Sequence, residues 1–281
     1  MSFRLLASLL VLCFVSNARA IEGLSLGLGH PVQASLVSGV DAVVPGQSFW
    51  IGLHFKIQPH WHTYWINPGD TGTRTHLTLD APGLAFGPLL HPLPERFVSE
   101  DYASFGYENE VLHLIRVTAD KGLSPKGTVT IKGHATWLVC KQTCIKGKAD
   151  FTLELPVATK TSAVNEELFT HWHEQLPQAP TSDVLSIIDL SSFDSSQRRF
   201  DITWAGKVQP KHVDWLPIAT DAIAVEGIKL SHQGKRTSVS FDVEVFNREQ
   251  IKGGRLDGVI VWKDPDGRRR GTSVSVRVLQ P

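Results

Sequence analysis

The chain has 281 residues, in which 28 Lys and Arg residues balance 28 Asp and Glu residues. This balance provides no general electrostatic field for nucleic acid or for an anionic membrane, so neither is an expected partner. The length suits one large domain or two domains of about the size of an immunoglobulin-like module. The single methionine is Met1, so the rest of the chain lacks the thioether ligands that copper-handling proteins often use.

Residues 1–20 have the pattern of a secretory signal peptide. Arg4 stands near the start, an apolar run covers residues 5–15, and Ala18-Arg19-Ala20 forms an A-x-A cleavage pattern. The apolar run is too short to anchor the chain in a bilayer, and no later stretch approaches ~20 apolar residues. Cys13 is removed with this segment. We therefore expect a soluble, exported chain in an oxidising compartment, where disulfides persist.

Strand patterns dominate the chain up to about residue 160. Pro82–Pro94 is rich in Gly and Pro and predicts a long loop. Asn165–Leu176 has apolar residues at helical spacing and acidic residues in its first turn, which predicts a helix, and Pro177 and Pro180 predict a linker after it. Alternating or β-branched segments predict the strands Gln33–Val37, Ser48–Ile57, Thr75–Leu79, Val111–Thr118, Gly127–Val139 and Ala149–Leu155.

A second set of strand signals follows the linker. Within it, Arg268-Arg269-Arg270 follows the turn signal Asp264-Pro265-Asp266-Gly267, and we interpret the run as a solvated hairpin arm rather than a binding patch. No motif in this half carries recognisable chemistry. The predicted strands are Val184–Asp189, Arg199–Trp204, Ala222–Leu230, Ser238–Phe246, Arg255–Lys263 and Thr272–Val278.

We therefore expect an all-β protein with two β-sandwich-like domains. The predicted organisation is a signal peptide over 1–20, a first sandwich over 21–160, a short helix and linker over 161–181, and a second β-rich, sandwich-like domain of unknown role over 182–281.

Two cysteines remain after export, and they lie four residues apart in Trp137-Leu138-Val139-Cys140-Lys141-Gln142-Thr143-Cys144. In an extended strand, residues four apart are separated by roughly 13 Å, whereas a disulfide needs Cα atoms within about 7 Å. The chain must turn at residues 141–143 if the sulfurs are to meet, and a three-residue hairpin loop would place Cys140 opposite Cys144. Lys141, with Lys146 and Lys148, would favour the thiolate that thiol–disulfide exchange requires.

Other interpretations of these residues stay open. A purely structural disulfide is one, although a bridge that closes about five residues constrains the unfolded chain by only ~2 kcal/mol. A soft metal site for Cu(I) or Zn is another, because histidines and thiols are suitable ligands. Its candidates, besides the two cysteines, are His54, His60, His62 and His134. Their spacing matches no standard zinc pattern, so we expect no metal and assign these histidines structural or surface roles.

Several segments resemble the periplasmic N-terminal (alpha) domain of the DsbD and ScsB family of thiol–disulfide interchange proteins. They are Pro59–Asp70 (PHWHTYWINPGD), Pro94–Phe97 (PERF), Phe105–Glu108 (FGYE) and Trp137–Ile145 (WLVCKQTCI). The resemblance covers about the first half of the exported chain. It differs at Lys146, where relatives often have proline.

The resemblance implies an immunoglobulin-like fold for the first domain, and a Cys140–Cys144 pair that carries electrons in the periplasm. It also implies a flexible cap loop over Glu95–Phe105, in which Phe97 shields the sulfurs. The possible neighbours of the site are Lys141, Trp137, Tyr107 and Glu108.

The predicted function is that of a thiol–disulfide oxidoreductase of the protein-disulfide reductase type, with no cofactor. The sequence ends at Pro281 without a membrane domain, so we expect a separate membrane electron transporter as the donor. Periplasmic thioredoxin-like or disulfide-bearing proteins are the expected acceptors. The alternative is a copper-tolerance or metal-binding protein, since the resembling family is linked to copper stress, or a binding module with an inert disulfide.

Overall fold

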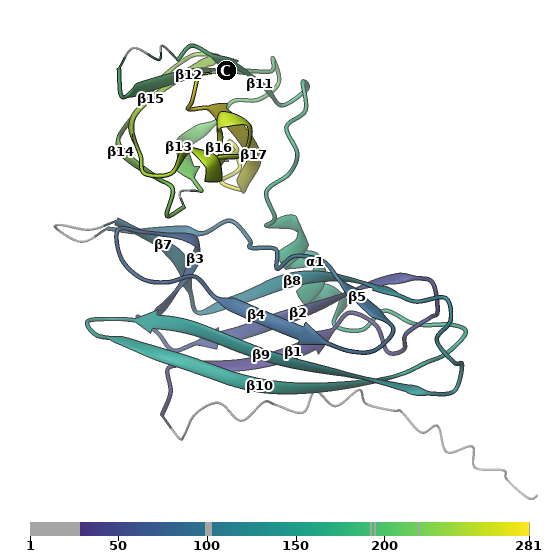
Figure 1. The fold of residues 1–281 in the computed structure, drawn as a ribbon. Coiled ribbons are helices and arrows are strands. Elements are labelled where there is room, and N and C mark those ends of the chain that lie inside the picture. The colour runs from purple at the N-terminus through teal and green to yellow at the C-terminus, as the bar shows by residue number, and fades with distance from the viewer. Residues whose placement is uncertain (1–28, 99–102, 192, 194, 219, 281) are drawn as a thin grey trace, which may run out of the picture.

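The structure is a computed structural model that describes residues 29–98, 103–191, 193, 195–218 and 220–280. The chain is mostly β and forms two sandwiches of antiparallel sheets, joined through the helix α1 (Figure 1). The predicted all-β class with two sandwiches is therefore confirmed. The predicted signal peptide over residues 1–20 lies outside the described residues.

The first sandwich packs a four-stranded sheet against a six-stranded one. The four-stranded sheet has the order β1 (Val32–Ser38), β2 (Ser48–Ile57), β8 (Glu110–Ala119) and β5 (Leu84–Phe86). The six-stranded sheet has the order β10 (Cys144–Pro156), β9 (Thr128–Cys140), β3 (His62–Gly69), β7 (Ala103–Glu108) and β6 (Glu95–Val98), with β4 (His76–Asp80) also paired to β9. Strands β2 and β8 are apolar along most of their length because they lie in the centre of their sheet.

The longest strands, β9 and β10, form a hairpin whose residues alternate between the core and solvent. In β9 every second residue from Val129 to Val139 is buried, and the alternate positions 132, 134 and 136 are exposed. The sequence predicts the second strand only from Ala149, but β10 begins at Cys144. Four of the five added residues are exposed, and apolar and polar residues do not alternate among them, which hides the strand pattern in the sequence.

Several strands of the first sandwich are not predicted by the sequence. Strand β3 ends in Asn67-Pro68-Gly69, a turn-like sequence, and its pairing with β7 is interrupted by a bulge between Tyr64 and Gly69. The predicted loop Pro82–Pro94 contains the short strand β5, which pairs with β8. These strands are short or irregular and depend on partners distant in sequence, so local patterns do not reveal them.

Helix α1 (Glu166–Glu174) lies within the predicted helical segment and covers the outer side of β8 (Figure 1). Its buried residue Phe169 packs with Leu112 and Leu114 of β8. The acidic residues Glu166 and Glu167 lie in its first turn, where the helix dipole favours negative charge.

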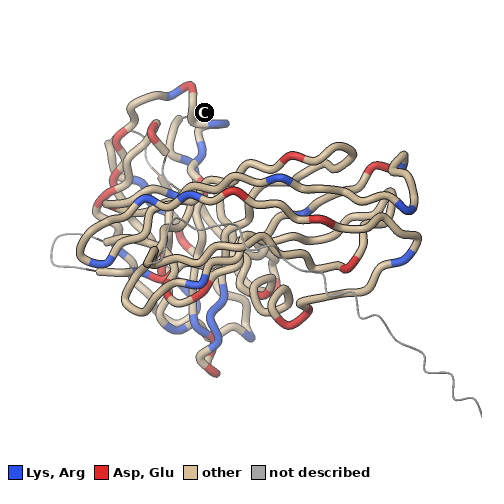
Figure 2. Tube along the Cα trace, turned by 90° about the horizontal axis from the view of Figure 1, so that it is seen from below, with Lys and Arg blue, Asp and Glu red and all other residues tan. Residues whose placement is uncertain are grey.

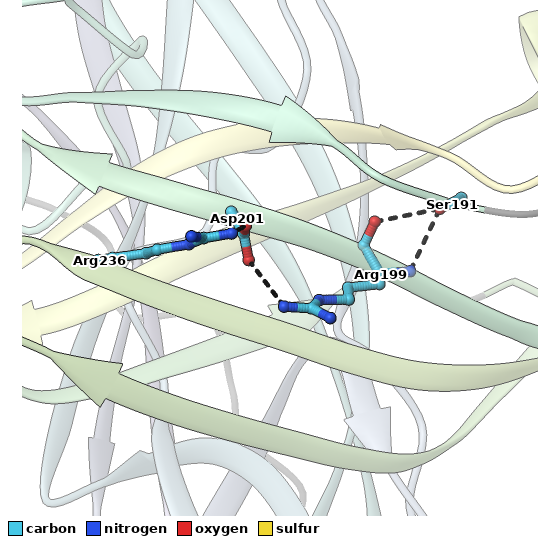
Figure 3. Close-up of polar contacts among 4 residues, drawn as sticks. All are labelled: Ser191, Arg199, Asp201 and Arg236. Carbon is cyan, nitrogen blue, oxygen red and sulfur yellow. Dashed lines mark hydrogen bonds and ion pairs between the residues drawn. The ribbon is translucent and has the colours of Figure 1, made fainter.

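The second sandwich combines a four-stranded and a three-stranded sheet. The four-stranded sheet has the order β11 (Leu185–Asp189), β12 (Gln197–Trp204), β15 (Arg236–Val245) and β14 (Ile223–Gln233). The other sheet has the order β13 (Lys211–Pro217), β16 (Arg255–Lys263) and β17 (Arg269–Arg277), and the short 3-10 helices η1 (Arg248–Gln250) and η2 (Lys252–Gly254) precede β16. Its core contains Trp204, Trp215, Phe200 and Phe241. On its polar face the buried carboxylate of Asp201 contacts Arg236 and lies 3.8 Å from Arg199 (Figure 3).

Positive and negative side chains are interspersed along both sandwiches (Figure 2). This pattern fits the balanced charge of the sequence. No helix within the described ranges has the length and hydropathy needed to cross a bilayer.

Candidate active site around the Cys140–Cys144 disulfide

Cys140 and Cys144 form a disulfide at the tip of the β9–β10 hairpin. Cys140 ends β9 and Cys144 begins β10, and the two are paired across the ladder with Cα atoms 4.1 Å apart. The chain turns through residues 141–143, where the Lys141 N–H donates to the Thr143 carbonyl at 3.3 Å. The predicted three-residue loop and the opposed cysteines are therefore confirmed.

The two cysteines differ in their exposure to solvent. Cys140 is 4% exposed and packs beneath the hairpin tip, whereas Cys144 is exposed. A thiolate attacking from outside therefore reaches the Cys144 sulfur much more easily than the Cys140 sulfur.

Strand β3 places two side chains beside the disulfide. His62 is the register partner of Cys140, and the Tyr64 hydroxyl lies 3.9 Å from the Cys144 Sγ. The rings of His62 and Tyr64 lie 5.2 Å apart because residues two apart in a strand share one face. Burial raises the pKa of Tyr64, against a hydrogen bond with Thr71 that lowers it, so the phenol stays protonated and can donate towards sulfur. Sequence reasoning missed Tyr64, although its alternation with His62 was the available signal.

Phe97 of β6 covers His62. Its ring stacks on the imidazole with centroids 4.7 Å apart and planes inclined by 22°. Strand β6 pairs with β7, and β7 pairs with β3, so Phe97 reaches His62 across the intervening strand. Residues 99–102, at the tip of the expected Glu95–Phe105 cap loop, lie outside the described residues. The stack places an aromatic ring over the imidazole that borders Cys140.

The imidazole of His62 lies between the disulfide and an acidic residue. Its register partners are Cys140 on β9 and Glu108 on β7. Burial lowers the pKa of His62, and the negative charge of Glu108 partly opposes this effect. His62 is therefore mostly neutral at neutral pH, and an uncharged imidazole can exchange a proton with a nearby thiol.

The other neighbours that the sequence predicted differ in their exposure: one is exposed and two are buried. Lys141 is exposed in the turn between the cysteines. Trp137 is buried in the core, where its ring contacts Phe55 with centroids 4.8 Å apart. Tyr107 is also buried, and its hydroxyl donates to the Pro92 carbonyl at 2.7 Å. The structure thus brings Glu108 and Phe97 to the disulfide through His62, and places Trp137 and Tyr107 in the core beneath it.

The candidate metal ligands are dispersed. His54 lies 2.6 Å from Glu110, and His134 lies 2.6 Å from Asp150. Within the described part of the chain, no group of three or more His, Cys, Asp or Glu side chains could hold a metal ion. These histidines instead have carboxylate partners.

Comparison with known proteins finds a family model that matches the first sandwich and a solved structure whose fold resembles both sandwiches. A family model described as "Thiol:disulfide interchange protein DsbD, N-terminal" matches residues 33–156. The crystal structure of the N-terminal periplasmic domain of ScsB from Proteus mirabilis aligns with 92% of this chain and 100% of that chain, at a TM-score of 0.63 and 19% sequence identity. At this identity the likeness concerns the fold, which extends over both sandwiches, and the expected immunoglobulin-like fold of the first domain is confirmed.

A second structure, of a protein of unknown function from Porphyromonas gingivalis W83, aligns with 88% of this chain and 100% of that chain. Its TM-score of 0.24 and sequence identity of 13% are too low to support an argument. No curated protein matches the sequence.

Proposed function

Residues 33–156 match the family model of the DsbD N-terminal domain, and from this match we propose that the chain is a periplasmic thiol–disulfide oxidoreductase that works through Cys140 and Cys144. The observation that carries the proposal is the disulfide at a hairpin tip, with one sulfur exposed and the other buried beneath it. The periplasmic domain of ScsB has the same fold, which supports the proposed compartment.

In the proposed reaction, a thiolate of the electron donor attacks the Cys144 sulfur, and the Cys140 sulfur leaves as a thiolate. A second donor thiolate then attacks the donor sulfur of the mixed disulfide. This releases an oxidised donor and leaves both cysteines reduced, so two electrons have been transferred. The Cys144 thiolate next attacks the disulfide of an acceptor protein, and Cys140 resolves the resulting mixed disulfide. The cycle needs no cofactor.

The surroundings suit this exchange. The Tyr64 hydroxyl, 3.9 Å from the Cys144 Sγ, is positioned to stabilise a thiolate there. The largely neutral imidazole of His62 borders Cys140, the sulfur that leaves in the first step and attacks in the last. Phe97 stacks on that imidazole and limits the approach of small oxidants to the reduced pair. Protein partners that displace Phe97 would gain access.

A purely structural role for the disulfide is less well supported. The β9–β10 ladder already holds Cys140 and Cys144 opposite each other, from that pair to Thr128 and Pro156. A bridge across a loop of about five residues adds only ~2 kcal/mol to a hairpin of this kind. A separate membrane transporter is the proposed donor, and thioredoxin-like or disulfide-bearing periplasmic proteins are the proposed acceptors.

The test is exchange between the reduced protein and an oxidised thioredoxin-like protein, followed by quenching with an alkylating reagent. We expect Cys140→Ser and Cys144→Ser each to lose more than about 99% of the exchange rate, because each variant lacks one half of the two-electron couple. The Cys140→Ser variant should accumulate a mixed disulfide through the exposed Cys144, and Cys144→Ser should accumulate little. Unchanged exchange in both variants would refute the proposal.

A further inference from the structure

The second sandwich holds the strand that carries Phe97. We call β6 and β7 together the cap hairpin. Just before β6, the Arg269 side chain of β17 donates through Nη1 to the Leu93 carbonyl at 3.2 Å and through Nη2 to the Pro94 carbonyl. A guanidinium is a planar fork of donors, so one side chain can fix two consecutive carbonyls. The base of the cap hairpin is thus tied to the second sandwich.

A second polar contact joins the cap hairpin to the same sheet. Arg96, directly before Phe97, lies with Nη1 3.6 Å from the Asp214 Oδ2 of β13. The charge of Asp214 also acts on Arg269, so one carboxylate faces both arginines. Glu95, the first residue of β6, adds negative charge near Arg269. Burial lowers the pKa of Arg269, and the charges of Glu95 and Asp214 oppose this effect.

Apolar packing makes this contact close. Leu93 is buried against Gly271 of β17, where an added Cβ would lie 2.3 Å from the Leu93 side chain. Leu216, Val259 and Val261 of the second sandwich belong to the core cluster of the first. Figure 1 shows the sheet β13–β16–β17 facing the end of the first sandwich at β3 and β7.

The strand beside the disulfide is attached to the same surface. Asn67 of β3 is buried and donates through Nδ2 to the Pro217 carbonyl at the end of β13, at 2.6 Å. Strand β3 also carries His62 and Tyr64. Two strands of the site, β3 beside the sulfurs and β6 with Phe97, are therefore both attached to one sheet of the second sandwich.

We propose that the second sandwich controls access to the Cys140–Cys144 disulfide, with Arg269 as the positioning residue that keeps the cap hairpin over His62. This inference gives a role to the second domain and rests on the proposed function only in assuming that access to the disulfide matters. While Arg269 holds the Leu93 and Pro94 carbonyls, Phe97 stays stacked on His62. A partner that binds at the junction of the two sandwiches and displaces Arg269 would release the cap hairpin.

The position of Arg269 corrects the interpretation of the run Arg268–Arg270 as a solvated arm. Arg268 is exposed and lies 3.7 Å from Asp266, and Arg270 lies 3.0 Å from Asp264, both partners within the second sandwich. Arg269 points away from these two, towards the first sandwich, because side chains alternate along a strand. Its two neighbours are therefore matched controls of the same residue type.

The test measures how fast dithiothreitol reduces the disulfide in the full chain without its signal peptide. We expect Arg269→Ala to speed reduction about tenfold, because it removes charge-assisted hydrogen bonds that hold the cap hairpin closed. Arg268→Ala and Arg270→Ala should change the rate less than about twofold, because the carboxylate that each side chain contacts lies within the second sandwich. Equal rates in the wild type and Arg269→Ala would overturn the proposal.

A second variant separates positioning from general loosening. In a Phe97→Ala background, Arg269→Ala should add almost nothing, since its effect passes through Phe97; full additivity would overturn the proposal. Val276→Ala weakens the core of the second sandwich without touching the contact, and an equal acceleration there would also overturn it. If Arg269→Ala does not fold, Asp214→Asn replaces it, because this variant removes the negative charge that faces Arg96 and Arg269. We expect it to speed reduction of the disulfide by less than Arg269→Ala would. Because dithiothreitol reports access alone, failure of exchange with protein partners would leave these results interpretable.

Discussion

Buried polar groups are left unpaired more often in the first sandwich than in the second. In the first, both ring nitrogens of His113 and the Nδ1 of His91 are buried with no hydrogen-bond partner among the described residues, and the two rings lie 4.9 Å apart. In the second, Asp201 contacts Arg236, and the buried Trp204 donates its indole N–H to Thr237 at 2.9 Å. The indole N–H of Trp215 and the Oδ1 of Asp201 are exceptions in the second, although that oxygen lies 3.8 Å from Arg199.

An unpaired buried polar group costs about 1–3 kcal/mol, so such groups lower the stability of the first sandwich more than that of the second. His113 also contacts Tyr107 of the cap hairpin, with ring centroids 5.2 Å apart. The second sandwich pairs its buried carboxylate and supplies a firm surface for the first. A domain without reactive groups of its own can therefore determine how the reactive groups of its neighbour are exposed.

Acid should produce the largest difference in stability between the two sandwiches. Burial, with the charges of Arg74 and His76, lowers the pKa of His91 to about 4, and burial lowers the pKa of His113 well below its ordinary value. Between about pH 6.5 and pH 4 the unfolded chain therefore binds more protons than the folded one. We expect His91 alone to lower the free energy of unfolding by about 1.4 kcal/mol for each pH unit as the pH falls through this range.

Asp201 gives the second sandwich a dependence of the same direction, but at lower pH. Burial raises its pKa, but hydrogen bonds from Ser238 and Arg236 outweigh burial, and the net pKa is lowered. Its contribution to stability is therefore present above the ordinary pKa of about 3.9 and is lost only in stronger acid. We would compare hydrogen exchange at pH 7 and at pH 5. Local opening should become more frequent at pH 5 in the first sandwich and should stay unchanged in the second. A His91→Gln variant with the same pH dependence as the wild type would contradict this explanation.

Removing the paired charge of the second sandwich should have the next largest effect. Asp201→Asn leaves Arg236 and Arg199 without their carboxylate and should lower the free energy of unfolding by about 1–3 kcal/mol. The control Asp266→Asn, in an exposed pair with Arg268, should cost less than about 1 kcal/mol. Urea unfolding measures both. Equal losses in the two variants would show that the Asp201 pair is no more important than a surface contact.

A smaller effect is expected from removing the ring over His62. Phe97→Ala should speed oxidation of the reduced cysteines by dissolved oxygen by about fivefold, since it removes the ring that stacks on His62 and that we propose to shield the pair. Val98→Ala is the matched control, because Val98 is 72% exposed on the adjacent position of the same strand. Thiol titration over time gives both rates. An unchanged rate in Phe97→Ala would mean that the ring does not protect the sulfurs.

The smallest change is expected at Tyr64. Tyr64→Phe removes one hydroxyl, 3.9 Å from the Cys144 Sγ, and keeps the ring. A weak hydrogen bond of this kind contributes about 0.5–1 kcal/mol, so the pKa of the Cys144 thiol in the reduced protein should rise by less than about one pH unit. The pH dependence of alkylation measures it. A thiol pKa identical to that of the wild type would remove Tyr64 from the mechanism.

The sequence predicted the features that depend on local geometry. The spacing of Cys140 and Cys144 required a turn, and alternation in β9 identified its buried face, so the hairpin and its disulfide followed from a short segment. The cap hairpin and β3 were not predicted as strands, because their pairing depends on residues far away in the chain. The alternating strand patterns were enough to predict the fold class. The residues beside the sulfurs could be identified only from the register in which distant strands pair.

One interpretation was wrong because it considered which residues occur and not the direction in which their side chains point. Three consecutive arginines indicate a solvated arm, yet alternation along β17 turns Arg269 towards Leu93 and Pro94. The sequence contained the signal, since a run of like charges in a strand must place its middle residue on the other face. What lies on that face depends on the contact between the two sandwiches, which no local pattern reveals.

The reduction potential of the Cys140–Cys144 pair tests most directly whether this disulfide carries electrons. The purified protein without its signal peptide would be equilibrated with glutathione or dithiothreitol buffers, and its free thiols trapped. We expect a value between about −180 and −270 mV, within the range of known thiol–disulfide exchangers. A value well below about −300 mV, together with slow exchange, would identify a structural bridge and contradict the proposed function.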